Sequence, residues 1–228
     1  MILSFLNSRF FLIFTFPFIL GAMTVFSFQP FNHNYINFFI LPALFLTTTY
    51  VQKRSRNTYR QKPYLFNLFL IGYLFGIGFF LTGTSWISHS LTFDENFKFL
   101  IPISIIGLPL FLGIFFGLAN LIAGPFLKNN FVSILLFSSS FAFFDFLRAK
   151  IFTGFPWNIW AYTWSWTPDV LQLLPVLGFF SFNLFCLIFY CTPLLLIFRK
   201  KFGYTLFILF IFISFSNYIY GNSLIKKN

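Results

Sequence analysis

The chain consists mainly of long apolar runs separated by short polar connections. A helix that crosses the hydrocarbon core of a bilayer needs about 20 apolar residues, and seven runs come close to or exceed that length. They cover residues 10–28, 36–51, 64–90, 99–126, 131–147, 170–198 and 202–220. We therefore predict an all-α fold, a polytopic transmembrane helical bundle with about seven spans. Residues 1–228 then form a single transmembrane domain, with no soluble domain.

The composition agrees with a membrane protein and excludes an ordinary soluble domain. Hydrophobic residues make up 58% and charged residues 8% of the 228 residues, whereas a soluble domain carries about 25% charged residues. The net charge is +11, but the cations are spread along an apolar chain. A nucleic-acid-binding surface would need them clustered on a polar domain, so we predict no nucleic-acid partner.

The positions of the cations predict the orientation of the chain in the membrane. The segment at 53–62 holds five cations and no acid, and short loops rich in Lys and Arg lie on the cytoplasmic side. With this loop inside, the N-terminus is also cytoplasmic, and ten of the fifteen cations fall on the cytoplasmic side. Seven spans then place the C-terminus outside.

Small residues and prolines indicate how two of the runs pack. Gly72 and Gly76 in the third run form a small-xxx-small pair, which lets a second helix approach closely. Pro102, Pro109 and Pro125 punctuate the fourth run. A proline kinks a membrane helix and frees backbone groups that neighbours must satisfy, so we expect this helix to pack against protein on at least one side.

Residues 144–162, FDFLRAKIFTGFPWNIWAY, gather polar and turn-forming residues in a very apolar chain. Asp145 and Arg148 are three residues apart, so on a helix they share a face and can pair. An unpaired ion near the membrane boundary would cost about 2–3 kcal/mol, which favours a structural ion pair. The functional alternative is that Arg148 and Lys150, on the outer side, attract the phosphates of lipids.

The end of this segment is rich in aromatic residues. Gly154 and Pro156 cannot continue a helix and predict a turn. Four tryptophans follow within ten residues, at positions 157, 160, 164 and 166. Two interpretations remain open: an aromatic belt at the membrane surface, or a cleft for a lipid chain that is walled by these rings and has Arg148 and Asn158 at its opening.

The run from 145 to 162 closely resembles the membrane-domain signature of bacterial apolipoprotein N-acyltransferases, which reads approximately acid-x-x-Arg, then Thr-Gly-Phe-Pro-Trp, then Gly-Tyr. Weaker matches are Gln29-Pro30-Phe31, the glycine-rich third run that ends near Trp86-Ile87-Ser88, and the segment 175–183. The resemblance covers essentially the whole chain. It departs from the family at Asp145, where the family usually has Glu, and at Ala161, where Gly often precedes the Tyr.

The resemblance implies the last step of lipoprotein maturation in the bacterial inner (cytoplasmic) membrane. An acyl chain moves from a phospholipid to a Cys thiol, and then to the α-amine of a diacylglyceryl-cysteine at the N-terminus of a lipoprotein. In that family a periplasmic nitrilase-like domain with a Glu-Lys-Cys triad performs the reaction, by covalent catalysis with an activated thiol. The outward C-terminus predicted from seven spans would then be periplasmic, and we expect no cofactor.

The residues of this chain offer no such triad. Glu95 lies in a short loop, and the two cysteines, Cys186 and Cys191, lie within the sixth apolar run. Buried thiols of this kind are inert packing groups, and a disulfide is not expected because residues five apart on a helix point to different faces. We also find no metal-ligand cluster and no phosphate-binding glycine loop. We therefore predict no catalytic and no metal-binding residues in this chain, and no activity of the chain alone.

The leading hypothesis is the membrane domain of an apolipoprotein N-acyltransferase whose catalytic domain is absent from this sequence, because the gene is shortened or split or the record is truncated. Its partners would be membrane phospholipid as acyl donor, the lipoprotein N-terminus and, for a split gene, a separately encoded nitrilase-like polypeptide. The substrate-binding residues would be Arg148, Phe155, Trp157, Asn158 and Tyr162. The alternatives are a small multipass transporter, which would need ionisable residues at midplane depth, and a non-catalytic lipid-binding membrane protein.

Overall fold

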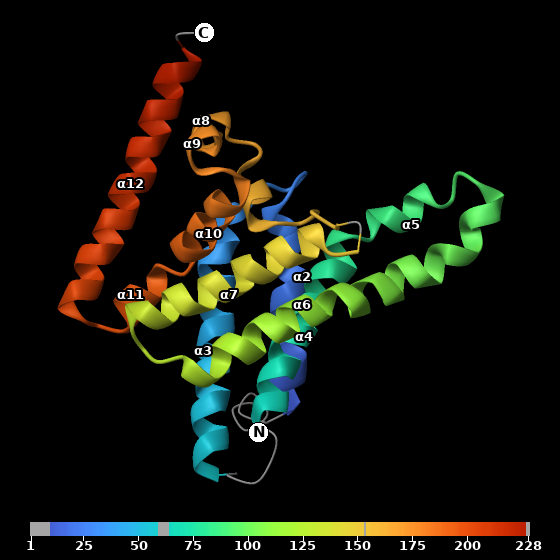
Figure 1. Cartoon of the computed structure of the whole chain (residues 1–228), viewed down its shortest axis with the longest axis horizontal. Helices are drawn as coiled ribbons and strands as arrows, with labels where there is room; N and C mark the ends of the chain where they lie inside the picture. The colour runs from blue at the N-terminus through green and yellow to red at the C-terminus, as the bar shows by residue number, and fades with distance from the viewer. Residues whose placement is uncertain (1–9, 59–63, 153, 227–228) are drawn as a thin grey trace.

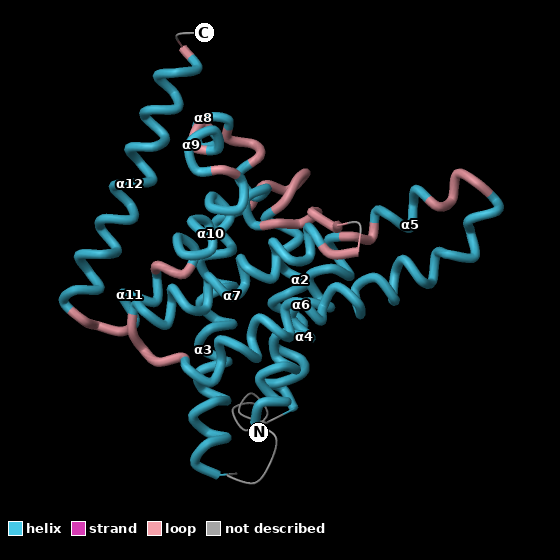
Figure 2. The backbone as a smooth tube through the Cα atoms, in the orientation of Figure 1, coloured by secondary structure: helices cyan, strands magenta, loops and turns pink. Residues whose placement is uncertain are grey.

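The computed structural model describes residues 10–58, 64–152 and 154–226, and in these residues every regular element is helical (Figures 1 and 2). Arg9, part of the cationic loop at 53–62 and Thr153 lie outside the described residues. The elements, with η for 3-10 and π turns, are η1 (Phe11–Thr15), α2 (Phe16–Met23), η2 (Thr24–Ser27), η3 (Asn34–Ile36), α3 (Asn37–Thr58), α4 (Tyr64–Gly83), α5 (Trp86–Ser90), η4 (Glu95–Leu100), η5 (Ile103–Gly107), α6 (Leu108–Ala123), η6 (Gly124–Phe126), α7 (Phe131–Lys150), η7 (Trp160–Trp164), α8 (Pro168–Leu171), α9 (Leu174–Leu177), α10 (Phe179–Tyr190), α11 (Pro193–Ile197) and α12 (Lys201–Ile225).

Within the described residues, five helical segments are long and apolar enough to cross a membrane. They are Tyr64–Ser90, Ile103–Phe126, Phe131–Lys150, Phe179–Ile197 and Lys201–Ile225. Two further apolar segments, Phe11–Ser27 and Pro168–Leu177, are shorter. The prediction of an all-α membrane protein is thus confirmed, whereas the count of about seven spans is not.

The sixth apolar run differs most from the prediction. Residues 170–198 do not form one helix, because Gly178 has a φ of 75°, in the left-handed region that a right-handed helix cannot contain. The short helices α8 and α9 precede this glycine, and the apolar helix begins only at Phe179. Figure 1 shows α8 and α9 at the top of the molecule, beside the upper part of α12.

The second run forms α3, which is not among the five apolar segments. Several of its polar side chains are buried, among them Thr48 and Gln52. Thr48 Oγ1 donates to the carbonyl of Leu44 at 2.9 Å, and Gln52 Nε2 donates to the carbonyl of Pro125 at 2.9 Å. Because Thr48 and Gln52 find hydrogen-bond acceptors inside the protein, this part of α3 packs within the bundle although its sequence is less apolar than that of its neighbours.

Helices α4 and α6 share the most extensive contact between described helices, and α2 packs on another side of α4. A Cβ atom built on Gly72 would lie 2.3 Å from the carbonyl oxygen of Phe116, and one built on Gly76 would lie 2.8 Å from the Cα of Gly113. The two backbones therefore approach as closely as the small-xxx-small pattern predicted, and the partner is the proline-punctuated fourth run.

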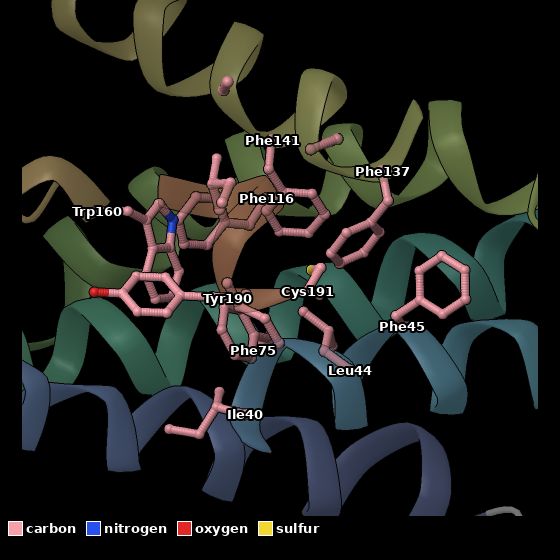
Figure 3. Packing of buried hydrophobic residues seen from close by; sticks show 14 of the residues in the cluster. Ile40, Leu44, Phe45, Phe75, Phe116, Phe137, Phe141, Trp160, Tyr190 and Cys191 are labelled. Atoms are coloured by element: carbon pink, nitrogen blue, oxygen red, sulfur yellow. The ribbon is translucent and has the colours of Figure 1, made fainter. Parts of the chain in front are cut away.

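Aromatic rings fill the centre of the bundle (Figure 3). Phe137 and Phe141 of α7 lie 4.5 Å apart between ring centroids, and Phe141 lies 5.4 Å from Phe116 of α6. Figure 3 places Cys191 among these side chains. Both Cys186 and Cys191 are free and buried, as predicted for packing residues.

Helix α12 runs along one side of the molecule (Figure 1). Its Phe210 ring lies 6.2 Å from that of Phe131 of α7 and 6.3 Å from that of Phe185 of α10. The helix contacts α8 near one end and α11 near the other, and only 6% of its apolar stretch is buried inside the protein. Its large side chains, such as Ile208, Phe212 and Phe215, are exposed. In a membrane these side chains would face lipid.

Candidate functional site

The last turns of α7 carry a buried ion pair. Asp145 and Arg148 have exposed fractions of 0% and 1%, and Arg148 Nη2 lies 3.0 Å from Asp145 Oδ1. The guanidinium carbon lies 4.9 Å from the centre of the Phe80 ring of α4, a favourable position for a cation over an aromatic face. Hydrogen bonds to other protein acceptors offset part of the cost of burying such a pair.

Arg148 supplies such bonds to the turn that follows the helix. Its Nη1 donates to the carbonyls of Phe155 at 2.8 Å and Trp157 at 2.7 Å, while the Phe155 N–H donates to the Arg148 carbonyl at 2.9 Å. Gly154 has a φ of 83°, which suits glycine. One arginine therefore fixes the Gly-Phe-Pro-Trp turn against the end of α7.

Asn183 of α10 joins this cluster from a distant part of the chain. Its Nδ2 donates to Asp145 Oδ2 at 3.1 Å, and its Oδ1 accepts from the Ala161 N–H at 3.1 Å. The network thus ties α7, η7 and α10 together. The sequence analysis placed Asn183 in a weak family match but gave it no role in the site, although a polar residue within an apolar run was an available signal.

The other predicted site residues lie near the surface around this turn. Trp157 is 52% exposed and packs edge-to-face on Trp86 with 5.6 Å between ring centroids. Tyr162 is partly exposed, and its ring centroid lies 4.9 Å from that of Phe179. The Asn158 side chain packs over Gly83, where a Cβ would lie 2.5 Å from Nδ2. The clustered tryptophans differ in exposure: Trp157 lies at the surface, whereas Trp160 is buried.

Trp160 belongs to the core. It is fully buried and its ring lies 5.3 Å from that of Phe79 and 6.5 Å from that of Phe75, as Figure 3 illustrates for Trp160 and Phe75. Neither the aromatic belt nor the lipid-chain cleft therefore includes this residue. The burial follows from these aromatic rings of α4, which pack against the indole.

A small apolar cavity of about 220 Å³ adjoins the turn. Arg148 and Phe155 contribute to its wall, together with Leu108, Phe111, Leu112, Phe115, Ile151, Phe152 and Gly154. Arg148 Nε is buried and has no hydrogen-bond partner among the described residues. The structure thus brings two of the five predicted substrate-binding residues to one cavity, while Trp157, Asn158 and Tyr162 do not line it. The α6 side of the wall was not predicted.

The sequence segment that contains this site matches a known protein family. The family model described as "Apolipoprotein N-acyltransferase N-terminal domain" matches residues 20–192. The chain belongs to the apolipoprotein N-acyltransferase family. The match includes the Asp145–Arg148 pair, the Gly-Phe-Pro-Trp turn and Asn183, and it confirms the family predicted from the sequence.

Curated apolipoprotein N-acyltransferases from several bacteria are similar to the chain. It is 35% identical to that of Brucella melitensis over 127 residues, which is 55% of this chain and 24% of the relative. It is 34% identical to that of Rickettsia prowazekii over 167 residues, 72% of this chain and 32% of the relative. For Rickettsia typhi the identity is 31% over 188 residues, 81% of this chain and 35% of the relative. The chain therefore spans about a quarter to a third of the length of these relatives.

Proposed function

We propose that this chain acts as the membrane part of an apolipoprotein N-acyltransferase and takes part in the phospholipid-dependent N-acylation of lipoproteins. In this proposal, the chain lies in the bacterial inner membrane with the turn at 154–157 on the periplasmic side. A nitrilase-like polypeptide supplies the Glu-Lys-Cys triad. The acyl group leaves a phospholipid ester for that thiol and then passes from the thioester to the α-amine of the diacylglyceryl-cysteine.

The observation that carries the proposal is the clamped turn beside an apolar cavity. Arg148 holds the backbone of Phe155 and Trp157, so the aromatic side chains of the turn have a fixed position. An apolar cavity of about 150 Å³ already suffices for a benzene molecule, and the cavity here measures about 220 Å³. It therefore has room for part of an acyl chain, with Phe155 in its wall.

In this proposal Arg148 positions the turn rather than contacting lipid phosphate. The guanidinium is 1% exposed, and its Nη1 and Nη2 donate to protein acceptors. Direct contact with substrate is better suited to Trp157, which is exposed beside Trp86. Asn158 and Tyr162 would extend the same aromatic and polar rim.

Two further observations support this assignment over the alternatives. Cys186 and Cys191 are buried in or next to α10, so a reactive thiol is expected from another polypeptide segment. Among the described residues, the buried charged side chains are Asp145 and Arg148, and they neutralise each other. A transporter would need ionisable groups that are free to bind a coupling ion.

The proposal is tested by lipoprotein acylation in membranes that contain this chain, a nitrilase-like polypeptide of the family, or both. We expect transfer of an acyl group to a diacylglyceryl lipopeptide only when both are present, with mass spectrometry of the lipopeptide as the measurement. Absence of the product with both components contradicts the proposal. Acylation by the chain alone would show that the thiol is not supplied from elsewhere.

We predict that Trp157→Ala slows acyl loading from phospholipid in this assay about two- to tenfold, because an aromatic pair contributes about 0.5–1.5 kcal/mol beyond its burial. The measurement is the rate at which the partner's thiol becomes acylated. Phe39→Ala is the matched control, since Phe39 is a large exposed side chain of α3 outside the turn. An unchanged rate for Trp157→Ala removes this residue from the site.

A further inference from the structure

Helix α12 is fastened to α8 near its C-terminal end. Asn222 Nδ2 donates to Asp169 Oδ1 at 3.0 Å, and Asn217 Nδ2 donates to the Val170 carbonyl at 3.1 Å. A Cβ built on Gly221 would lie 1.9 Å from the Asp169 carbonyl oxygen, so the two backbones touch. These contacts hold residues 217–222 of α12 against α8.

The other end of α12 is held at α11, where a Cβ on Gly203 would lie 2.9 Å from the Leu195 carbonyl oxygen. Next to the α8 fastening, α12 is separated from α10 by a cavity of about 620 Å³. This volume lies within the range of about 300–1,000 Å³ that is usual for small-molecule sites. Its wall is formed by α8, α10, α12 and residues 164–167.

Three polar atoms in this wall are buried and have no hydrogen-bond partner among the described residues. They are Thr167 Oγ1, Ser214 Oγ and Asn217 Oδ1. Asn217 is only 8% exposed, so its second amide atom cannot be satisfied from the protein surface. An unsatisfied buried polar group destabilises a protein. All three residues belong to the wall of one cavity, so with a small side-chain rotation they could offer a ligand two hydroxyl donors and one amide acceptor.

The remainder of the wall is apolar. Phe182, Phe185 and Phe189 of α10 face Ile211 and Phe215 of α12 across the cavity. Because so little of the apolar stretch of α12 is buried, the surroundings of the cavity in a membrane are lipid chains. The ligand must then be amphipathic, with its polar part near α8 and its apolar part between the helices.

We propose that this cavity holds one resident glycerophospholipid, whose ester carbonyls accept from Thr167 and Ser214 and whose acyl chain separates α12 from α10. Asp169 is the acid in the described lining, which contains no Lys or Arg. A headgroup with an ammonium, which can also donate to Asn217 Oδ1, therefore fits better than an anionic headgroup. The site lies away from the turn at 154–157 and does not depend on the proposed acylation.

The test is native mass spectrometry of the purified chain after lipid removal and incubation with phosphatidylethanolamine. We expect one lipid to remain on each chain under conditions that strip surface-bound lipid. Ser214→Phe fills the cavity and should abolish this retention. Ser216→Phe, the same change two residues away at an exposed position outside the lining, should retain it. The same incubation with phosphatidylglycerol should give lower occupancy.

A second variant keeps the test valid if Ser214→Phe does not fold. Thr167→Val removes one hydroxyl while the side chain keeps its shape, and the loss of one hydrogen bond of about 1 kcal/mol should weaken lipid binding about fivefold in a titration. Binding equal to that of the unaltered chain would overturn the proposal.

Other outcomes also decide against a resident lipid. Absence of a retained lipid on the unaltered chain, or equal retention by Ser214→Phe and Ser216→Phe, would show that the cavity is not a lipid site. A dimer of this chain that Ser214→Phe disrupts and Ser216→Phe preserves would identify a protein helix as the occupant instead.

Discussion

Replacement of Arg148 by Met is expected to lower the free energy of unfolding by about 3–5 kcal/mol, the usual loss when one partner of a buried ion pair is removed. The change leaves Asp145 charged and buried, with Asn183 as its remaining hydrogen-bond partner. It also removes both donors to the carbonyls of Phe155 and Trp157. The measurement is thermal unfolding of the detergent-solubilised chain, followed by the fluorescence of its tryptophans.

The double variant Asp145→Leu, Arg148→Met separates the effect of charge from that of packing. An apolar replacement of a whole buried pair is often nearly neutral, so the double variant should be more stable than Arg148→Met alone. Some loss should persist, because the two carbonyls of the turn still lack their donor. If the single and double variants unfold at the same temperature, the uncompensated carboxylate is not the cause of the instability.

The all-helical class and most helix positions follow from the apolar runs, because a helix in a bilayer must be long and apolar. The breaks within a run are harder to predict. Pro175 and Gly178 both lie in the sixth run, yet prolines also occur within continuous membrane helices. Only the backbone of Gly178, with its φ of 75°, shows that the helix starts anew there.

The site divides in a similar way. The shared face of Asp145 and Arg148 and the turn at 154–157 are local features, so spacing and residue type suffice to predict them. The contacts of Arg148 with Phe80 and of Asp145 with Asn183 join residues far apart in the sequence. Such contacts depend on how helices pack. The substrate-binding role of the predicted residues stays a prediction.

The second large effect is expected at the contact between α4 and α6, where Gly72→Ala should lower the free energy of unfolding by about 1–3 kcal/mol through overpacking. The added Cβ would lie 2.3 Å from the carbonyl oxygen of Phe116 and 2.6 Å from the Cβ of Asn120. Backbone cannot rotate away as a flexible side chain can, so the helices must separate. Thermal unfolding, recorded as for Arg148→Met, measures the loss.

Gly107→Ala is the matched control, because it adds the same methyl group where the neighbouring side-chain atom Ile103 Cγ2 is at an ordinary contact distance of 3.5 Å. There the change should be neutral or stabilising by about 0.4–1 kcal/mol, since alanine restricts the unfolded chain. Equal unfolding temperatures for the two variants would contradict the close contact at Gly72.

Separation of helices α4 and α6 in Gly72→Ala would also strain the hydrogen bond from Asn120 Nδ2 to the Leu68 carbonyl, which is 2.7 Å long in the unaltered chain. Because α4 also carries Phe80 beneath Arg148, a shift of this helix should disturb the candidate site, so Gly72→Ala is expected to slow acyl loading as well as to lower stability.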